Sequence, residues 1–150
     1  MCSVGGMDFD DVRAMPATFP GTRMIEFGGD FFAIHDPAGD YEQRPRQGWA
    51  TLVRSDAHDS ASDLTRPGVY RLNIGRPRRR FRELTDEVVA PDFTEADVVM
   101  PHPVYAGYGW VCVLNPDRCR TTVETLLAEA HDFAVRKHDN AARRRTEASE

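Results

Sequence analysis

Lysine is almost absent from this sequence of 150 residues, since Lys137 is the only lysine among 19 lysines and arginines. The 24 aspartates and glutamates outnumber these cations, so the formal net charge is -5 and the isoelectric point is about 5.5. The overall charge therefore gives no attraction to nucleic acid or to an anionic membrane. Only a local cluster of arginines could supply such a contact.

Cysteine is scarce as well, and long apolar runs are missing. Cys2, Cys112 and Cys119 are odd in number and form no C-x-x-C pair, which fits a reducing compartment better than a disulfide framework. No apolar run reaches the length of a membrane span, and the first six residues lack the basic and apolar regions of a secretory leader. We expect a cytoplasmic protein without a membrane partner.

The length of the chain predicts one domain that buries its own core. Hydrophobic residues make up 41% of the sequence and charged residues 29%, which is typical of a soluble globular protein. We expect a flexible N-terminus over residues 1–7, a single α+β domain over residues 8–138 and a flexible polar tail over residues 139–150.

The spacing of apolar residues predicts both strands and helices. A short helix is expected to begin at Asp8, and a long C-terminal helix carries apolar residues at helical spacing from Val123 to Ala134. A second short helix is expected over residues 76–84. Strands are predicted over residues 23–27, 31–35, 49–54, 68–74 and 110–114. Because these strands do not alternate with helices, we expect an α+β fold with a mainly antiparallel sheet packed against the helices.

A cluster of arginines follows the fourth predicted strand, with five arginines within the seven residues 76–82. Such a cluster can bind phosphates or another anion. The alternative is the solvent-facing side of a short helix that buries Phe81 and Leu84, and clusters of one charge sign are usually of this second kind. We name four candidate contacts for an anion or nucleic acid: Arg76, Arg78, Arg79 and Arg82.

A second candidate site precedes the last predicted strand. Residues 101–110 combine one histidine with three aromatic residues and two glycines, a composition typical of the lining of a small-molecule pocket. There the histidine would act as an acid or a base. The alternative is a loop that its aromatic residues anchor to the core. We name five candidate pocket residues: His35, His102, Tyr105, Tyr108 and Trp110.

Motifs for catalysis, metals and cofactors are missing. Histidines and aspartates occur at residues 35–40, 58–59 and 102, but without the spacing of a zinc protease or of a calcium loop. Neither Cys112 nor Cys119 is linked by local sequence to a histidine, and there is no G-x-S-x-G elbow. We therefore name no catalytic residue, no metal site and no cofactor, and leave open whether the protein is an enzyme.

Several strings in the chain resemble a family of small uncharacterised proteins from high-GC bacteria, an origin that also fits the preference for arginine over lysine. The strings are Gly29–Phe32, Ala61–Leu64, Arg66–Gly75, Pro101–Tyr105 and Gly109–Pro116. This resemblance covers most of the chain but implies no established activity.

The order of the predicted elements is also similar to that of the MmcQ/YjbR-like proteins. The matching pieces are residues 70–84, the strand that begins after Trp110, and the helix over residues 122–137. This resemblance implies a compact α+β fold and a general role in DNA binding.

The sequence supports two functional hypotheses. In the first, the protein is a non-enzymatic binding module that contacts nucleic acid or another anion through the arginine cluster. In the second, it is a small-molecule-binding protein or a small enzyme with a pocket around His102. A pocket that holds His102 together with His35 or an acidic residue would favour the second hypothesis, whereas a solid core there would leave only an anchored loop. A homodimer through the sheet edge or the long helix is left open.

Overall fold

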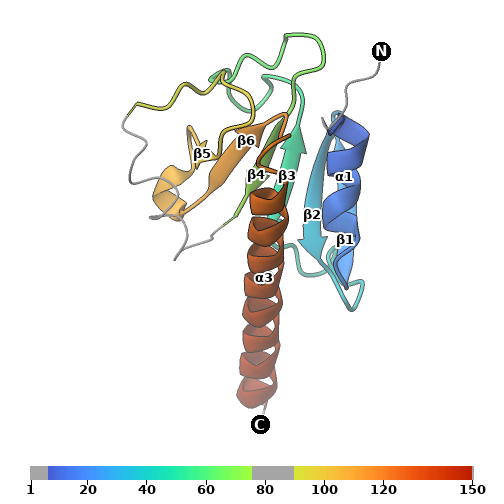
Figure 1. Cartoon of the computed structure of the whole chain (residues 1–150). Coiled ribbons are helices and arrows are strands. Elements are labelled where there is room, and N and C mark those ends of the chain that lie inside the picture. The colour runs from blue at the N-terminus through green and yellow to red at the C-terminus, as the bar shows by residue number, and fades with distance from the viewer. Residues whose placement is uncertain (1–6, 76–89, 150) are drawn as a thin grey trace.

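The computed structural model describes residues 7–75 and 90–149, and these residues form the α+β fold that the sequence predicted (Figure 1). The strands form one antiparallel sheet in the order β1-β2-β3-β4-β6-β5. They are β1 (Thr22–Phe27), β2 (Asp30–His35), β3 (Ala50–Val53), β4 (Arg71–Ile74), β5 (Met100–Pro101) and β6 (Val111–Leu114). The helices are α1 (Phe9–Ala17), the short 3-10 helix η1 (Ala106–Tyr108) and α3 (Arg120–Ser149).

The hairpin between β1 and β2 follows from local sequence. Phe27 pairs with Asp30 across a two-residue turn formed by Gly28 and Gly29. The φ angles of these glycines are 62° and 88°, a region that residues with a Cβ rarely adopt. The two glycines therefore fix the length and register of this hairpin, whose strands were predicted over residues 23–27 and 31–35.

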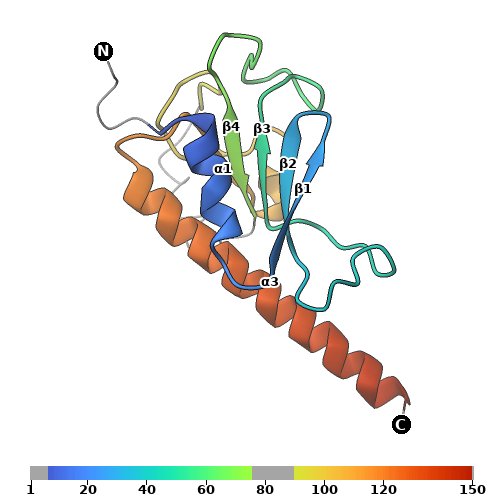
Figure 2. The same ribbon diagram turned by 90° about the vertical axis from the view of Figure 1, so that its right-hand side faces the viewer.

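One face of the sheet is covered by the short helix α1 and the long helix α3. Figure 2 shows α1 and α3 in front of the strands. Val12 from α1 and Leu126 and Leu127 from α3 are buried in the same cluster as Leu72 and Ile74 from β4. The core therefore lies between the helices and this face, as expected when sheet and helices each bury one apolar side.

Helix α3 is longer than the sequence predicted. The expected polar tail over residues 139–150 is helical as far as Ser149, and Figure 1 shows this part of α3 running past the end of the sheet. The reason is intrinsic preference, since Ala141, Ala142 and the arginines 143–145 are strong helix formers even without a core to cover. The flexibility of this segment remains a prediction.

Two loops lie over the other face of the sheet. Residues 54–70 and 102–110 cross it, and the first of these buries Leu64 against Val53 and Leu114. Within the described ranges, no helix has the length and apolar character needed to cross a membrane. Where the loops over residues 54–70 and 102–110 lie on this face, polar side chains from the strands can meet polar side chains from the loops.

Candidate ligand-binding pocket

Strand β4 presents polar residues to the loop-covered face. Leu72 and Ile74 point into the core, and the two-residue period of a strand turns Arg71 and Asn73 the other way. Asn73 lies opposite Thr51 of β3, and its Nδ2 donates to the Thr51 hydroxyl at 2.9 Å. A row of polar side chains therefore runs across the middle of the sheet.

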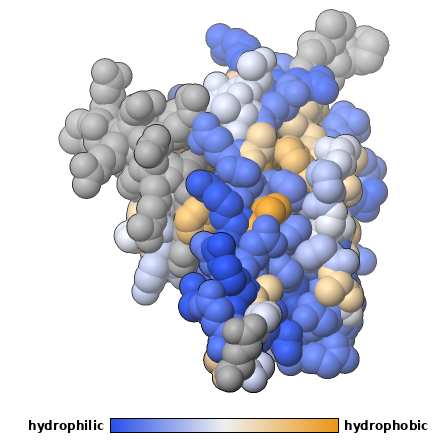
Figure 3. Space-filling model, turned by 90° about the horizontal axis from the view of Figure 1, so that it is seen from below, coloured by the Kyte–Doolittle hydropathy of each residue, from blue (hydrophilic) through white to orange (hydrophobic). Residues whose placement is uncertain are grey.

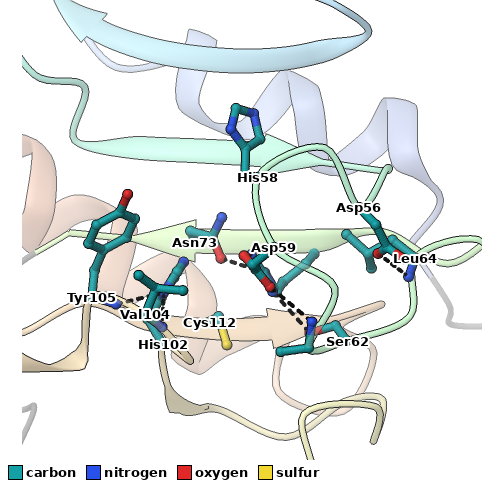
Figure 4. A network of polar contacts seen from close by, with 12 residues as sticks. Asp56, His58, Asp59, Ser62, Leu64, Asn73, His102, Val104, Tyr105 and Cys112 are labelled. Carbon is teal, nitrogen blue, oxygen red and sulfur yellow. Dashed lines mark hydrogen bonds and ion pairs between the residues drawn. The ribbon is translucent and has the colours of Figure 1, made fainter.

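The guanidinium group of Arg71 is the centre of this row, although only 1% of the residue is exposed. Its Nε donates to Asn73 Oδ1 at 2.9 Å, and its Nη1 donates to Ser62 Oγ at 3.0 Å. Nη1 and Nη2 donate to the two carboxylate oxygens of Asp59 at 3.0 and 2.6 Å, in the bidentate geometry that arginine and carboxylates favour. Figure 4 shows this network, with Asp59 and Ser62 reaching the sheet from the loop over residues 54–70.

The buried ion pair of Arg71 and Asp59 contributes little net stability to the fold. The hydrogen bonds from Arg71 lower the pKa of Asp59, so this carboxylate is charged at neutral pH. Burying two charges costs several kcal/mol of solvation each, and apolar replacements of such pairs are often neutral or stabilising. Apolar side chains on this sheet face would pack under the loop without that loss of solvation. The ion pair nevertheless attaches the loop over residues 54–70 to the sheet and leaves a polar surface beneath that loop.

His102 is held in one orientation by its own loop. Its Nδ1 accepts hydrogen bonds from the backbone N–H groups of Val104 and Tyr105, both at 3.0 Å, and the residue is 4% exposed. Burial and the nearby positive charge of Arg71 lower the pKa of His102 to about 4, against a weaker opposing effect of Asp59. The ring is therefore neutral at pH 7 with its proton on Nε2, and it acts as a hydrogen-bond donor on that side.

A hollow of about 300 Å³ lies over the polar row. Its floor includes Arg71, Asn73 and His102, and its walls are largely apolar or aromatic. The apolar and aromatic lining residues are Phe32, Val53, Val104, Tyr105 and Trp110, and the polar residues Gln47, Thr51 and His58 also line the hollow. Apolar walls around a few fixed polar groups are the usual composition of a small-molecule site.

Gly75 allows Trp110 to form one end of this hollow. A Cβ at position 75 would come within 2.7 Å of the Cζ2 atom of Trp110, which is closer than two such atoms can approach. The absence of a side chain at Gly75 thus lets the indole ring lie against the end of β4.

Several hydrogen-bond donors in the floor of the hollow have no acceptor. One Nη2 hydrogen of Arg71, the second Nδ2 hydrogen of Asn73 and the Nε2 hydrogen of His102 have no acceptor among the described residues. The oxygens of Asp59 already accept from Arg71 and from the N–H of Ala61. The hollow therefore offers donors to a ligand, and the charge of Arg71 is already balanced.

The structure brings some of the predicted pocket residues together and separates others. His102, Tyr105 and Trp110 line the hollow, and the acidic residue beside them is Asp59. Tyr108 is 67% exposed and does not line it. His35 packs against His131 and His138 of α3, with ring centroids 5.6 and 5.1 Å apart, and lines a different hollow.

Two further sequence predictions concern the arginine cluster and metals. Arg76, Arg78, Arg79 and Arg82 lie outside the described residues, as does the short helix predicted over residues 76–84. Over residues 7–75 and 90–149, no three histidine, cysteine or carboxylate side chains are grouped closely enough to hold a metal ion.

Both described cysteines are held as thiols. Burial raises the pKa of Cys112 to about 12, and burial together with a hydrogen bond to Asp97 raises that of Cys119 to about 12. Cys119 directly precedes α3, and the N-terminus of a helix would by itself lower a thiol pKa. Neither sulfur is therefore an activated nucleophile at neutral pH.

The sequence pointed to His102 as a pocket residue but not to Arg71 and Asn73, the other two residues of the floor. The alternation along β4 placed Arg71 and Asn73 on one face, and two polar residues there were the available signal for a polar site. Nothing in the sequence linked that face to Asp59 and Ser62, because these residues reach it from a loop 9 to 12 positions earlier in the chain.

Comparison with known proteins gives a family but no activity. Residues 7–145 match the model of a family described as a family of unknown function, DUF6194. No curated protein and no solved structure matches the chain. The match agrees with the expectation of an uncharacterised family, and any function must be argued from the site itself.

Proposed function

The chain belongs to the DUF6194 family, and we propose that it is a small-molecule-binding protein whose ligand occupies the hollow beside His102. The observation that carries this proposal is the buried polar floor of Arg71, Asn73 and His102 beneath apolar walls. A pocket that holds His102 together with an acidic residue was named above as support for the small-molecule hypothesis. This hollow holds His102 together with Asp59.

The free donors of the floor define the ligand class. A ligand must offer acceptors, such as carbonyl oxygens or ring nitrogens, to the N–H groups of Arg71, Asn73 and His102. It should carry little charge, because Asp59 already neutralises Arg71 and an added anion would meet that carboxylate. The aromatic rings of Phe32, Tyr105 and Trp110 favour a flat ligand. We therefore propose a small, flat, uncharged molecule with several acceptor atoms.

The neutral state of His102 limits its chemical role. With Nδ1 occupied by two backbone N–H groups, the ring has no free lone pair to accept a proton from a ligand. A pKa of about 4 leaves little imidazolium at pH 7 to act as an acid. His102 is thus proposed to orient the ligand through Nε2, which favours binding over acid–base catalysis.

A variant that separates the two sides of His102 tests the proposal. In His102→Asn, the side-chain oxygen can replace Nδ1 as the acceptor for Val104 and Tyr105, while the Nε2–H donor is lost. Flat acceptor-rich compounds would be screened by thermal shift, and the dissociation constants of hits measured by isothermal titration calorimetry. We expect His102→Asn to weaken binding by about tenfold, the value of one hydrogen bond of about 1.4 kcal/mol.

The matched control is Tyr108→Ala, which removes an exposed aromatic residue from the same loop but not from the hollow. Its affinity for the hits should equal that of the unchanged protein. The proposal fails if compounds with acceptors stabilise the protein no more than compounds without them, or if both variants weaken binding equally.

The hypothesis of nucleic-acid binding through Arg76, Arg78, Arg79 and Arg82 stays a proposal, as do the likeness to MmcQ/YjbR-like proteins and a place in the cytoplasm of a high-GC bacterium. Fluorescence anisotropy of labelled DNA at low and near-physiological salt tests the first of these. Binding through phosphates must weaken steeply with salt, so absence of binding at low salt would remove it.

A further inference from the structure

A second hollow, of about 230 Å³, lies between α3 and the loop that joins β2 to β3. We call it the basic hollow, and its polar lining consists of His35, Arg44, Arg46, Gln47, Lys137, His138 and Arg145. It shares only Gln47 with the pocket beside His102. The far half of α3, which runs past the sheet in Figure 2, forms one wall.

The helix side of the basic hollow is a regular stripe. Lys137, Ala141 and Arg145 follow one another at intervals of four residues and therefore lie on one face of α3. The small side chain of Ala141 leaves room between the two cations. Figure 3, which views the molecule from below, shows a predominantly hydrophilic surface at this end.

Among the residues that the structure describes, the cations of this stripe have no acidic partners, in contrast to others on the same helix. Arg120 and Arg136 pair with acidic residues four positions away, Glu124 at 3.4 Å and Asp132 at 3.6 Å. No carboxylate of the described residues lies within 4.0 Å of the side-chain nitrogens of Lys137 or Arg145. The described lining of the basic hollow includes no acidic residue at all.

The loop side of the basic hollow is held in place by Arg46. Its guanidinium donates to the carbonyl of His35 at 2.9 Å, to Asp36 at 3.2 Å and to Asp40 at 2.5 Å. Arg44 has only a distant contact with Asp40, at 3.8 Å. Arg46 therefore fixes the wall, and Arg44 adds a cation that is free to turn toward a ligand.

Two imidazole rings close the inner end. His35 is 8% exposed, and the Nδ1 atoms of His35 and His138 are buried without a hydrogen-bond partner. Burial lowers the pKa of His35, and the neighbouring His138, His131 and Arg46 act in the same direction, whereas Asp139 opposes them. The surroundings of this ring thus disfavour another positive charge, and a bound anion would reverse that.

We propose that the basic hollow binds the phosphate group of a small phosphorylated molecule. Lys137 supplies a point charge, and Arg44 and Arg145 supply planar donor groups that match phosphate oxygens. A small ligand fits better than a long polyanion, because the contacts lie in a confined hollow on a protein whose net charge is -5. Gathering unpaired cations in one place is unfavourable by itself, and a dianion removes that repulsion.

The test compares two double variants of the full chain. Lys137→Ala with Arg145→Ala removes two cations from the hollow, and Arg143→Ala with Arg144→Ala removes two cations from the same helix outside it. Both keep a strong helix former at each position and lower the net charge equally. Inorganic pyrophosphate, inorganic phosphate and glycerol phosphate would be titrated into each protein by calorimetry at low salt.

We expect at least one of the three phosphates to bind the unchanged protein, with an affinity at least tenfold weaker in the hollow variant and changed less than threefold in the control. Tighter binding of glycerol phosphate than of inorganic phosphate would assign the site to an organic phosphate, and the reverse would assign it to free phosphate. The proposal is overturned if no phosphate binds at millimolar concentration or if both variants lose affinity equally. Binding of duplex DNA without binding of any small phosphate would also overturn it.

Discussion

At the scale of single residues, the position of one proton on His102 decides what the pocket can do. The backbone N–H groups of Val104 and Tyr105 occupy Nδ1, so the remaining proton lies on Nε2 at the floor of the hollow. A histidine in a loop usually suggests acid–base chemistry. Here the loop itself uses the lone pair, and the side chain becomes a fixed donor like the amide of Asn73 beside it.

The same residue makes the stability of the fold depend on pH. The pKa of His102 is about 4 in the folded protein and 6.5 in the reference state, so between these values the unfolded chain binds a proton that the folded protein does not. Stability must therefore fall as the pH decreases from about 6.5 to about 4, by at most about 3 kcal/mol for this residue. His35, whose pKa is also lowered, acts in the same direction.

Urea unfolding at pH 7.5, 6 and 5 measures this loss, and His102→Asn should lose distinctly less stability over the same range. Part of the loss remains in the variant because His35 is still present. Parallel curves for the two proteins would show that His102 is not held neutral by the fold.

At the scale of elements, the start of α3 depends on a carboxylate from a distant loop. Asp97 Oδ1 accepts from the N–H groups of Asp117 at 2.7 Å and Cys119 at 3.1 Å, and Oδ2 accepts from Arg118 at 2.9 Å. Burial acts to raise the pKa of Asp97, but these hydrogen bonds and one from the Cys119 thiol outweigh it and hold the pKa at about 2. The cap thus ties the loop before β5 to the helix that covers the core.

We expect Asp97→Asn to lower the free energy of unfolding at pH 7 by about 1–2 kcal/mol, because one charged acceptor is lost from the helix start. Asparagine is a suitable replacement, since it tolerates the positive φ of 61° at this position. Chemical denaturation measures the change. The difference from the unchanged protein should shrink as the pH falls from 3.8 toward 2, where Asp97 itself becomes protonated.

The control for this prediction is Asp117→Asn, which removes a negative charge from the same helix end. The variant keeps the backbone N–H of residue 117, which donates a hydrogen bond to Asp97. Its effect should be about 0.5 kcal/mol or less. Equal effects of the two variants would mean that only the charge near the helix end matters, and not the hydrogen bonds.

At the scale of the whole molecule, the two halves of α3 have different roles. The fully buried residues of this helix are Val123, Leu126, Leu127 and Ala130, all in its first half, where it covers the sheet. The second half contacts His35 of β2 through His138 and, together with the loop between β2 and β3, lines the basic hollow. Stability and the proposed phosphate site therefore depend on different parts of one continuous helix.

Deletion of residues 139–150 tests this division. We expect the free energy of unfolding to fall by no more than about 1–2 kcal/mol, because the deletion removes no fully buried side chain. Deletion of residues 120–150 should instead prevent folding, since it removes the four buried residues of α3. A loss of more than about 3 kcal/mol from the shorter deletion would show that the far half of the helix is part of the core.

The sequence by itself predicted five of the six strands, the first helix, the C-terminal helix and the α+β class, but not β5 or η1. These elements follow from local properties, such as the apolar spacing of α3, the Gly28-Gly29 turn and the alternation along β4. Local properties are visible in a sequence because backbone preference and side-chain direction act over a few residues. Boundaries were less certain where no core residue marks them, as at the end of α3. The α+β class followed from the order of these elements.

Only the tertiary structure decided which polar residues meet. His35 and His102 are similar in sequence terms, yet they lie in different hollows, on β2 beside α3 and in the loop before β6. The pairing of Arg71 with Asp59 and the cap from Asp97 join residues 12 and 20 or more positions apart. Such contacts depend on how loops fold back over a finished sheet, and no short-range pattern records that path.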